Sequence, residues 1–289
     1  MRYRIVHQTF YTYSSDVSVS HHVARLTPRE GAEQRTFNHQ LTMEPHASTL
    51  TTRVDYFGNE TSHFTVNGVH RSLKVIATSE VEVTPRPAPS EGGSWEEARQ
   101  ALTAPACHAD MDAQQFTYPS QHIPKLPGLA EYAQPSFAPG RSLLAAVVDL
   151  SGRIHRDFKF DTRATTIATP LEQVLKNRRG VCQDFAQLQI GGVRAMGLPA
   201  RYVSGYLETL PPPGAERLVG ADASHAWVQV YIPPNGWVNI DPTNDLIPST
   251  RHIVLAWGRD YDDVSPIRGV IVGGGKHTLT VGVDVEPIA

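Results

Sequence analysis

The stretch Arg179-Gly180-Val181-Cys182-Gln183-Asp184-Phe185-Ala186 places a thiol where a loop passes into a helix. Apolar side chains surround most of residues 185–196, and Gly197 and Pro199 then end the pattern. The sequence therefore predicts a buried helix whose first turn holds Cys182 at the surface of a cleft. A helix N-terminus favours negative charge, so this position favours the thiolate form of a cysteine.

Two strands predicted further along carry a histidine and an aspartate at their ends. His225 opens the β-branched and aromatic run 226–232, which the turn Pro233-Pro234-Asn235-Gly236 closes. The next strand, Trp237–Ile240, leads directly into Asp241. Adjacent antiparallel strands bring the two side chains close together, and a helix packed on the same sheet brings the thiol to that edge.

A cysteine, a histidine and an aspartate in this order supply a nucleophile, a base and a group that orients the base. Taken singly, a cysteine is more often an inert buried side chain, and an aspartate before proline is common in turns. Here each of the three lies at the end of a predicted element. The sequence therefore predicts Cys182 as the nucleophile, His225 as general base and acid, and Asp241 as the orienting carboxylate.

The segments around these residues resemble the bacterial transglutaminase-like cysteine protease family. The matching motifs are Gly180–Ala186, Pro199–Tyr206, Ser224–Trp227 and Gly236–Asn244, and the later segment Gly258–Pro266 also resembles a recurrent part of that family. The resemblance implies an α+β chain: an N-terminal all-β sandwich followed by a papain-like, transglutaminase-like α+β catalytic core. It also implies the same three catalytic residues.

The first third of the chain predicts the all-β region on its own pattern. Its short segments alternate apolar and polar residues, and Asn67-Gly68 is a hairpin signal. The predicted strands are Tyr3–Tyr13, Val17–Leu26, Gln34–Met43, Thr49–Tyr56, Ser62–Val66 and Val69–Ala77.

The proline-rich stretch Thr84–Gly93 predicts a stiff boundary after this region. We therefore expect a β-sandwich over residues 1–85, a linker with wrapping loops and short helices over 86–140, and the catalytic domain over 141–289. The tail from Val270 to Val285 predicts a hairpin that closes the main sheet of that last domain.

Composition limits the partners. The chain has 289 residues and a formal net charge of −3, with no basic run and no phosphate-cradling glycine loop. We expect no nucleic-acid partner and no membrane partner. The first residues lack an apolar signal core, which favours a cytoplasmic location. The two cysteines, Cys107 and Cys182, indicate no disulfide framework, and a reducing compartment would keep Cys182 reactive.

No cofactor and no metal site is expected. The histidines of the first third show no His-Glu-x-x-His pattern, and Asp260, Asp262 and Asp263 beside Arg259 make a poor calcium cage.

Four further features have open interpretations. Asp184 stabilises the helix start or faces substrate, and Arg201 pairs with a carboxylate. Gly205 admits a substrate backbone, and the insertion 209–221 forms either a cleft wall or an ordinary surface loop.

The chemistry expected is cysteine-dependent acyl transfer on amide bonds through a thioester, in a peptide or protein substrate. Water as the second nucleophile makes the chain a protease or amidase, which we favour. An amine makes it a transglutaminase-type amine transferase. A catalytically silent protein-binding module and a metal-dependent hydrolase also stay open, as does the oligomeric state.

Overall fold

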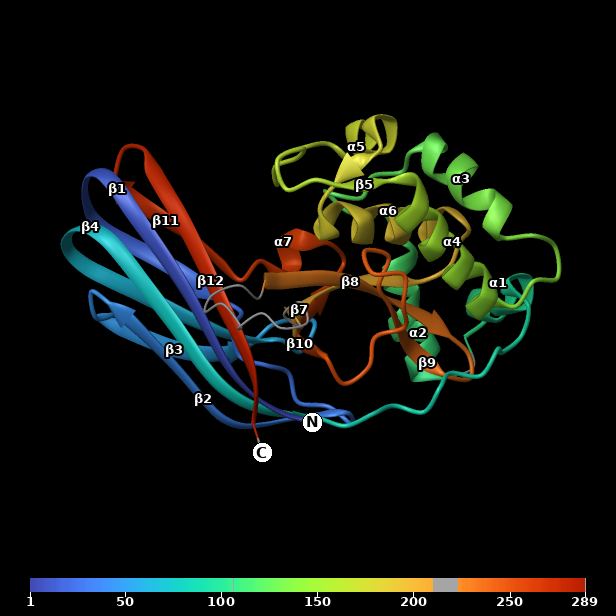
Figure 1. Cartoon of the computed structure of the whole chain (residues 1–289), viewed down its shortest axis with the longest axis horizontal. Coiled ribbons are helices and arrows are strands. Elements are labelled where there is room, and N and C mark those ends of the chain that lie inside the picture. The colour runs from blue at the N-terminus through green and yellow to red at the C-terminus, as the bar shows by residue number, and fades with distance from the viewer. Residues whose placement is uncertain (106, 210–222, 289) are drawn as a thin grey trace, which may run out of the picture.

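The computed structural model describes residues 1–105, 107–209 and 223–288. Figure 1 shows long curved strands on one side and, beside them, a second part in which helices cover one face of a smaller sheet. This arrangement confirms the predicted α+β class. Among the described helices, none is long and apolar enough to cross a membrane.

Two long strands organise the β-rich part. β1 (Arg2–Ala24) and β4 (Glu60–Val83) pair antiparallel along most of their lengths, and β2 (Gln34–Glu44) and β3 (Thr49–Val54) both pair with β4. Each of these two strands is continuous where the sequence predicts two shorter strands. All the strands of this part therefore belong to one hydrogen-bonded antiparallel sheet.

The hairpin predicted at Asn67-Gly68 is wrong. Gly68 has a φ of 105° but lies inside β4, where the pairing with β1 shifts register between Val17 and Val19. Glycine supplies this backbone conformation without strain in a bulged strand as readily as in a turn. The local signal is therefore real, but the chain does not reverse there.

The C-terminal strands join the β-rich sheet. β11 (Ile267–Gly273) and β12 (His277–Ile288) both pair antiparallel with β1. The prediction that this tail closes the sheet of the catalytic part is therefore wrong. Alternating residues predict a hairpin, but they do not say which sheet edge it joins.

The second part is built on an antiparallel sheet in the order β10-β7-β8-β9. Its strands are β7 (Ala200–Leu207), β8 (Ala223–Ile232), β9 (Gly236–Ile240) and β10 (His252–Gly258). Two short strands, β5 (Lys159–Phe160) and β6 (Arg179–Gly180), pair parallel near the start of the central helix. The helices are α1 (Trp95–Thr103), α2 (His108–Gln114), α3 (Pro127–Ala133), α4 (Leu143–Asp157), α5 (Leu171–Asn177), α6 (Cys182–Ala195) and α7 (Tyr261–Val264), with 3-10 turns η1 (Gln115–Thr117) and η2 (Gln134–Ser136).

Helix α6 is the buried helix that the sequence predicts. It packs against β8, α3 and α4, and nearly all of its side chains from Asp184 onward are buried. Asp184 fixes its start, because Oδ2 accepts the backbone N–H of Val181 at 2.8 Å and the hydroxyl of Thr165 at 2.6 Å. Gly197, with a φ of 79°, follows its end. Asp184 therefore stabilises the helix start, which is the first of the two roles considered for it.

The two parts share a buried interface. Tyr3 and Val283 of the β-rich sheet pack in one apolar cluster with Tyr206 of β7 and Leu255 of β10. The Tyr206 hydroxyl lies 2.9 Å from His7 Nδ1, and the Tyr3 hydroxyl donates to Glu208 Oε2 at 3.0 Å. Apolar packing and buried hydrogen bonds thus fix one sheet against the other.

Gly205→Ala is expected to destabilise the fold by about 3 kcal/mol, at the upper end of ordinary overpacking. A Cβ at Gly205 would lie 2.1 Å from the carbonyl oxygen of Ile253 and 2.5 Å from the ring of Trp227. The space next to Gly205 is thus filled by the chain's own strands, which leaves no room there for a substrate backbone. The urea midpoint measures the loss.

Gly31→Ala is the matched control, since a Cβ there meets nothing within 4 Å. Equal midpoints for the two variants would contradict the overpacking argument.

Candidate active site

The structure brings the three predicted catalytic residues to one end of the smaller sheet. Cys182 is the first residue of α6 and is partly exposed. His225 lies on β8, opposite Gly205 of β7, and is only 8% exposed. Asp241 directly follows β9 and is fully buried. Residues separated by up to 59 positions in sequence thus meet through the packing of α6 on β8.

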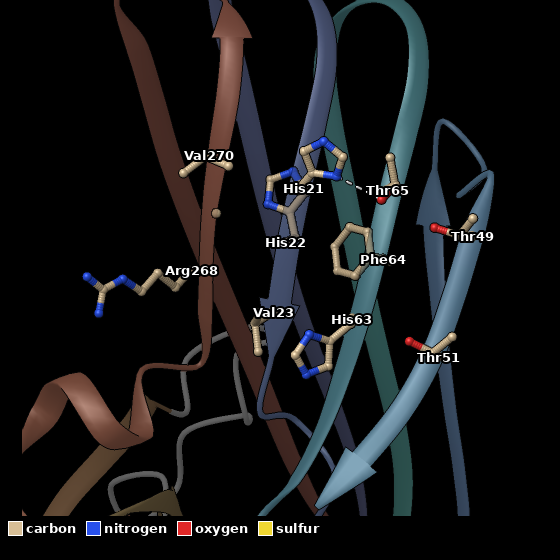
Figure 2. A pocket seen from close by; sticks show the side chains of 11 residues that line it. His21, His22, Val23, Thr49, Thr51, His63, Phe64, Thr65, Arg268 and Val270 are labelled. Carbon is tan, nitrogen blue, oxygen red and sulfur yellow. Dashed lines mark hydrogen bonds between the residues drawn. The ribbon is translucent and has the colours of Figure 1, made fainter. Parts of the chain in front are cut away.

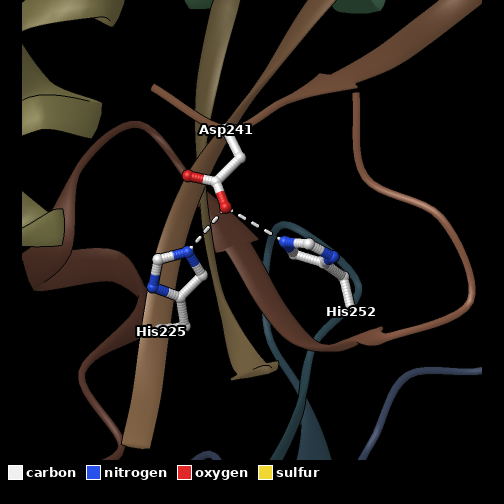
Figure 3. Close-up of side chains that lie close together, drawn as sticks. All are labelled: His225, Asp241 and His252. Atoms are coloured by element: carbon white, nitrogen blue, oxygen red, sulfur yellow. Dashed lines mark hydrogen bonds and ion pairs between the residues drawn. The ribbon is translucent and has the colours of Figure 1, made fainter. Parts of the chain in front are cut away.

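The imidazole of His225 contacts both of its predicted partners. Its Nε2 lies 2.8 Å from Asp241 Oδ2, a contact drawn in Figure 3, and Cys182 lies near enough to raise the pKa of the ring. Because Nε2 is used by Asp241, Nδ1 is the nitrogen left for the thiol. Burial lowers the pKa of His225, but the hydrogen bonds to Asp241 and Cys182 and the charges of both residues outweigh burial and raise it to about 10. An imidazolium beside a thiol favours the thiolate.

The carboxylate of Asp241 is held by several donors. Oδ1 accepts the backbone N–H groups of Thr243 at 2.9 Å and Asn244 at 3.2 Å, and the Asn244 side-chain amide donates to Oδ2 at 2.7 Å. Burial raises the pKa of Asp241, but the hydrogen bonds from His225, His252 and Asn244 hold it well below its usual range. Asp241 therefore stays ionised while buried.

His252 is a member of this cluster that sequence reasoning missed. It is the first residue of β10 and 6% exposed, and its Nε2 lies 3.1 Å from the same Oδ2 of Asp241 (Figure 3). An ionised carboxylate only accepts, so this nitrogen donates. Burial lowers the pKa of His252, which keeps this second imidazole neutral. Its one sequence signal is that, like His225, it is a histidine at the start of a strand.

His225, Asp241 and His252 are also the group of described residues whose ligand atoms lie close enough to hold a metal ion, within 4.8 Å of one another. Metal binding needs a free lone pair on each imidazole. The raised pKa of His225 keeps its ring protonated at neutral pH, so this imidazole has no free lone pair, and Nε2 of His252 donates to Asp241. The protonation state therefore suits a hydrogen-bonded triad better than a metal centre.

Trp227 fixes the two imidazoles from one side. Its ring stacks on His225 at an angle of 27° and meets the ring of His252 edge-on, with centroids 6.0 Å and 5.2 Å away. Its indole N–H donates to Asn239 Oδ1 at 2.9 Å. A buried indole whose N–H is bonded cannot rotate freely, so it holds both rings in place.

Other sequence predictions have mixed outcomes. The sequence predicts that Arg201 pairs with a carboxylate, but its Nε donates to the amide oxygen of Gln229 at 2.7 Å, so that prediction is wrong. The insertion 209–221 lies outside the described residues apart from Thr209. Cys107 is an exposed thiol that precedes α2.

The acidic trio near α7 is engaged by protein donors. Asp263 forms an ion pair with Arg259 at 2.8 Å, and Asp260 Oδ2 accepts the backbone N–H of His122 at 3.0 Å. Asp262 lies 3.3 Å from the His122 ring. These contacts use the oxygens that a calcium ion would need.

A hollow of about 450 Å³ lies on the β-rich sheet, and Figure 2 shows His21, His22 and His63 among the side chains that line it. His21 Nδ1 bonds the Thr65 hydroxyl at 2.9 Å, and His22 stacks on Phe64 with centroids 4.9 Å apart. His21 and His22 thus serve hydrogen bonding and packing.

Comparisons with known proteins connect this geometry to a family. Residues 3–82 match the bacterial transglutaminase-like N-terminal region, and residues 130–242 match the transglutaminase-like superfamily. An uncharacterized protein of Mycobacterium tuberculosis is 42% identical over 296 residues, covering 99% of this chain and 93% of that protein. A protein-glutamine gamma-glutamyltransferase of Pseudomonas aeruginosa is 32% identical over 133 residues, 45% of this chain and 20% of that protein.

A solved structure shares the fold over the whole chain. It is a candidate cysteine protease from Cytophaga hutchinsonii, with a TM-score of 0.77, 22% identity, and coverage of 99% of this chain and 90% of that one. At this level of identity the similarity shows the fold alone.

Proposed function

This chain belongs to the transglutaminase-like superfamily and carries the bacterial N-terminal region of that family, and from this premise we propose that it is a cysteine-dependent hydrolase of amide bonds in peptides or proteins. The observation that carries the proposal is the cluster of Cys182, His225 and Asp241, in which His225 Nε2 lies 2.8 Å from Asp241 Oδ2 and Cys182 lies near enough to raise the pKa of His225. A cytoplasmic location stays a prediction.

The proposed reaction has two steps. The Cys182 thiolate attacks the amide carbonyl, and the imidazolium of His225 gives its proton to the leaving amine, which leaves a thioester on the cysteine. Water then attacks the thioester with His225 as base, the acid is released and the thiol is restored. Asp241 keeps the ring oriented with Nδ1 toward the sulfur throughout.

The developing oxyanion needs donors near the sulfur. The first N–H groups of a helix have no intrahelical acceptor, and Cys182 is the first residue of α6. The backbone N–H of Cys182 is therefore the proposed first oxyanion donor. It lies on the nucleophile itself and needs no movement of another element.

Iodoacetamide is expected to label Cys182 at least about tenfold faster than Cys107 near pH 6, where an ordinary thiol is almost fully protonated. The reason is that the pKa of His225, about 10, keeps the imidazolium in place beside Cys182 across this range. The excess should shrink as the pH rises through about 8.5, where an ordinary thiol also becomes a thiolate. Mass spectrometry of the folded protein measures both rates.

Faster labelling of Cys107, or an inert Cys182 in the folded protein, would count against the nucleophile assignment. That outcome would favour the catalytically silent binding module instead.

Amine transfer is the second candidate, because the Pseudomonas relative is named a glutamyltransferase. Transfer needs a site that admits an amine while excluding water, whereas water is always present at high concentration. We expect free acid to form faster than amine-linked product when a peptide library is turned over with a competing primary amine.

The same assay is expected to give equal rates with a chelator and with added calcium, because Asp260, Asp262 and Asp263 are already bound by protein donors. Calcium-dependent turnover, or amine incorporation that outruns free acid, would overturn the hydrolase proposal in favour of a transferase.

A further inference from the structure

A cavity of about 300 Å³ lies between the smaller sheet and the β-rich part. The loop residues 29–34 and the end of β4 form one wall, and side chains from β7, β8, β9 and β10 form the other. Three indole rings, those of Trp227, Trp237 and Trp257, line it together with Arg201. The cavity thus combines aromatic rings with polar and charged side chains.

Arg201 is a buried cation in this wall that lacks a counter-ion. It is 7% exposed and more than nine-tenths buried around its guanidinium. That group lies 3.7 Å from the ring centre of Trp257 and 4.1 Å from that of Trp237. Its hydrogen bond runs from Nε to Gln229 Oε1, and among the described residues no carboxylate lies within ion-pair distance of it.

The other charged groups of the wall are already engaged. Glu33 pairs with Arg86 at 2.8 Å, and Glu30 Oε1 accepts the backbone N–H of Thr36 at 2.8 Å. Arg29 lies over Trp257 at 3.5 Å and donates to Asn59 Oδ1. Arg29 thus brings a second positive charge close to Arg201 and supplies no anion.

A buried cation without an anion is unfavourable unless something else compensates its charge. Cation–π contact with the indole rings of Trp237 and Trp257 compensates part of it. The Nη1 and Nη2 edge is what remains to donate. A planar carboxylate accepts two parallel hydrogen bonds from that edge.

We infer that this cavity is a binding site for a small monocarboxylate, which Arg201 holds by its two Nη groups while the indole rings contact the apolar remainder. The volume is at the low end of small-molecule sites, so a compact ligand fits and a peptide segment does not. Glu30 and Glu33 in the wall disfavour a doubly charged phosphate. Cys182 does not line this cavity, although Trp227 and His252 do, and the inference does not depend on the proposed hydrolysis.

Tryptophan fluorescence can detect ligand binding in this cavity, because three of the four tryptophans of the chain line it. The probes are benzoate, its uncharged analogue benzamide, and inorganic phosphate, titrated into the full chain at constant ionic strength. We expect a saturable change with benzoate and at least tenfold weaker binding of benzamide and of phosphate. No saturable change, equal binding of benzamide, or tighter binding of phosphate would each overturn the inference.

Arg201→Gln is expected to weaken benzoate binding at least tenfold, whereas Arg71→Gln should change it less than threefold because Arg71 is exposed, lies outside the cavity and pairs with Asp16. Circular dichroism and the melting temperature check that each variant is folded. Unchanged benzoate affinity in folded Arg201→Gln would contradict the site. If that variant does not fold, the comparison of benzoate with benzamide on the unaltered chain decides.

Discussion

Cys182→Ala is expected to abolish peptide turnover, with a loss on the order of 10⁴-fold or more. The sulfur is the atom proposed to form the thioester, and alanine offers no substitute. The side chain is only partly buried at the start of α6, so its removal should leave the fold intact. Turnover of the peptide library, measured beside circular dichroism, checks both points.

Cys107→Ala is the matched control, since Cys107 is an exposed thiol outside the cluster. It should keep full activity. Turnover that survives in Cys182→Ala but is lost in Cys107→Ala would show that the reacting thiol has been misassigned.

Asp241→Asn is expected to reduce turnover on the order of a hundredfold or more, by comparison with other triads. Oδ2 of Asp241 receives three donors, from His225, His252 and Asn244. An amide in its place either turns its NH₂ group toward those donors or leaves them facing a neutral oxygen. Either way the negative charge that helps raise the pKa of His225 is lost.

Two measurements accompany that variant. The labelling rate of Cys182 near pH 6 should fall with turnover, because fewer imidazoles stay protonated. Asp245→Asn is the control, since Asp245 is exposed and lies four residues along the same turn region. An active Asp241→Asn protein together with an inactive Asp245→Asn protein would require a different orienting carboxylate.

Local signals in the sequence were sufficient to predict the helix and strands that carry the candidate site. Glycine before Cys182, the apolar run after it, and the strand-turn-strand pattern from His225 to Asp241 each act over a few residues. A helix packed on adjacent antiparallel strands leaves few ways to arrange them, so the convergence of the thiol, imidazole and carboxylate could be predicted.

Features that depend on pairing between strands far apart in the sequence could not be predicted from local signals. The positive φ of Gly68 serves a bulge because β1 happens to lie beside it, and the C-terminal hairpin joins β1 through residues more than 240 positions away. His252 approaches Asp241 only because β10 lies next to β7. The partners of Arg201 likewise come from three different strands and an N-terminal loop.

The pairing of β11 and β12 with β1 also sets the order in which the chain can be completed during synthesis. β4 ends at Val83 and β11 begins at Ile267, and a ribosome needs about ten to forty seconds to add the residues between them at roughly 5–20 residues per second. For that interval one edge of the 23-residue strand β1 has no neighbour. Open strand edges invite pairing with other chains. The nascent protein is therefore most exposed to aggregation before its last strands leave the ribosome, and slower protein production or chaperone binding should matter most in that window.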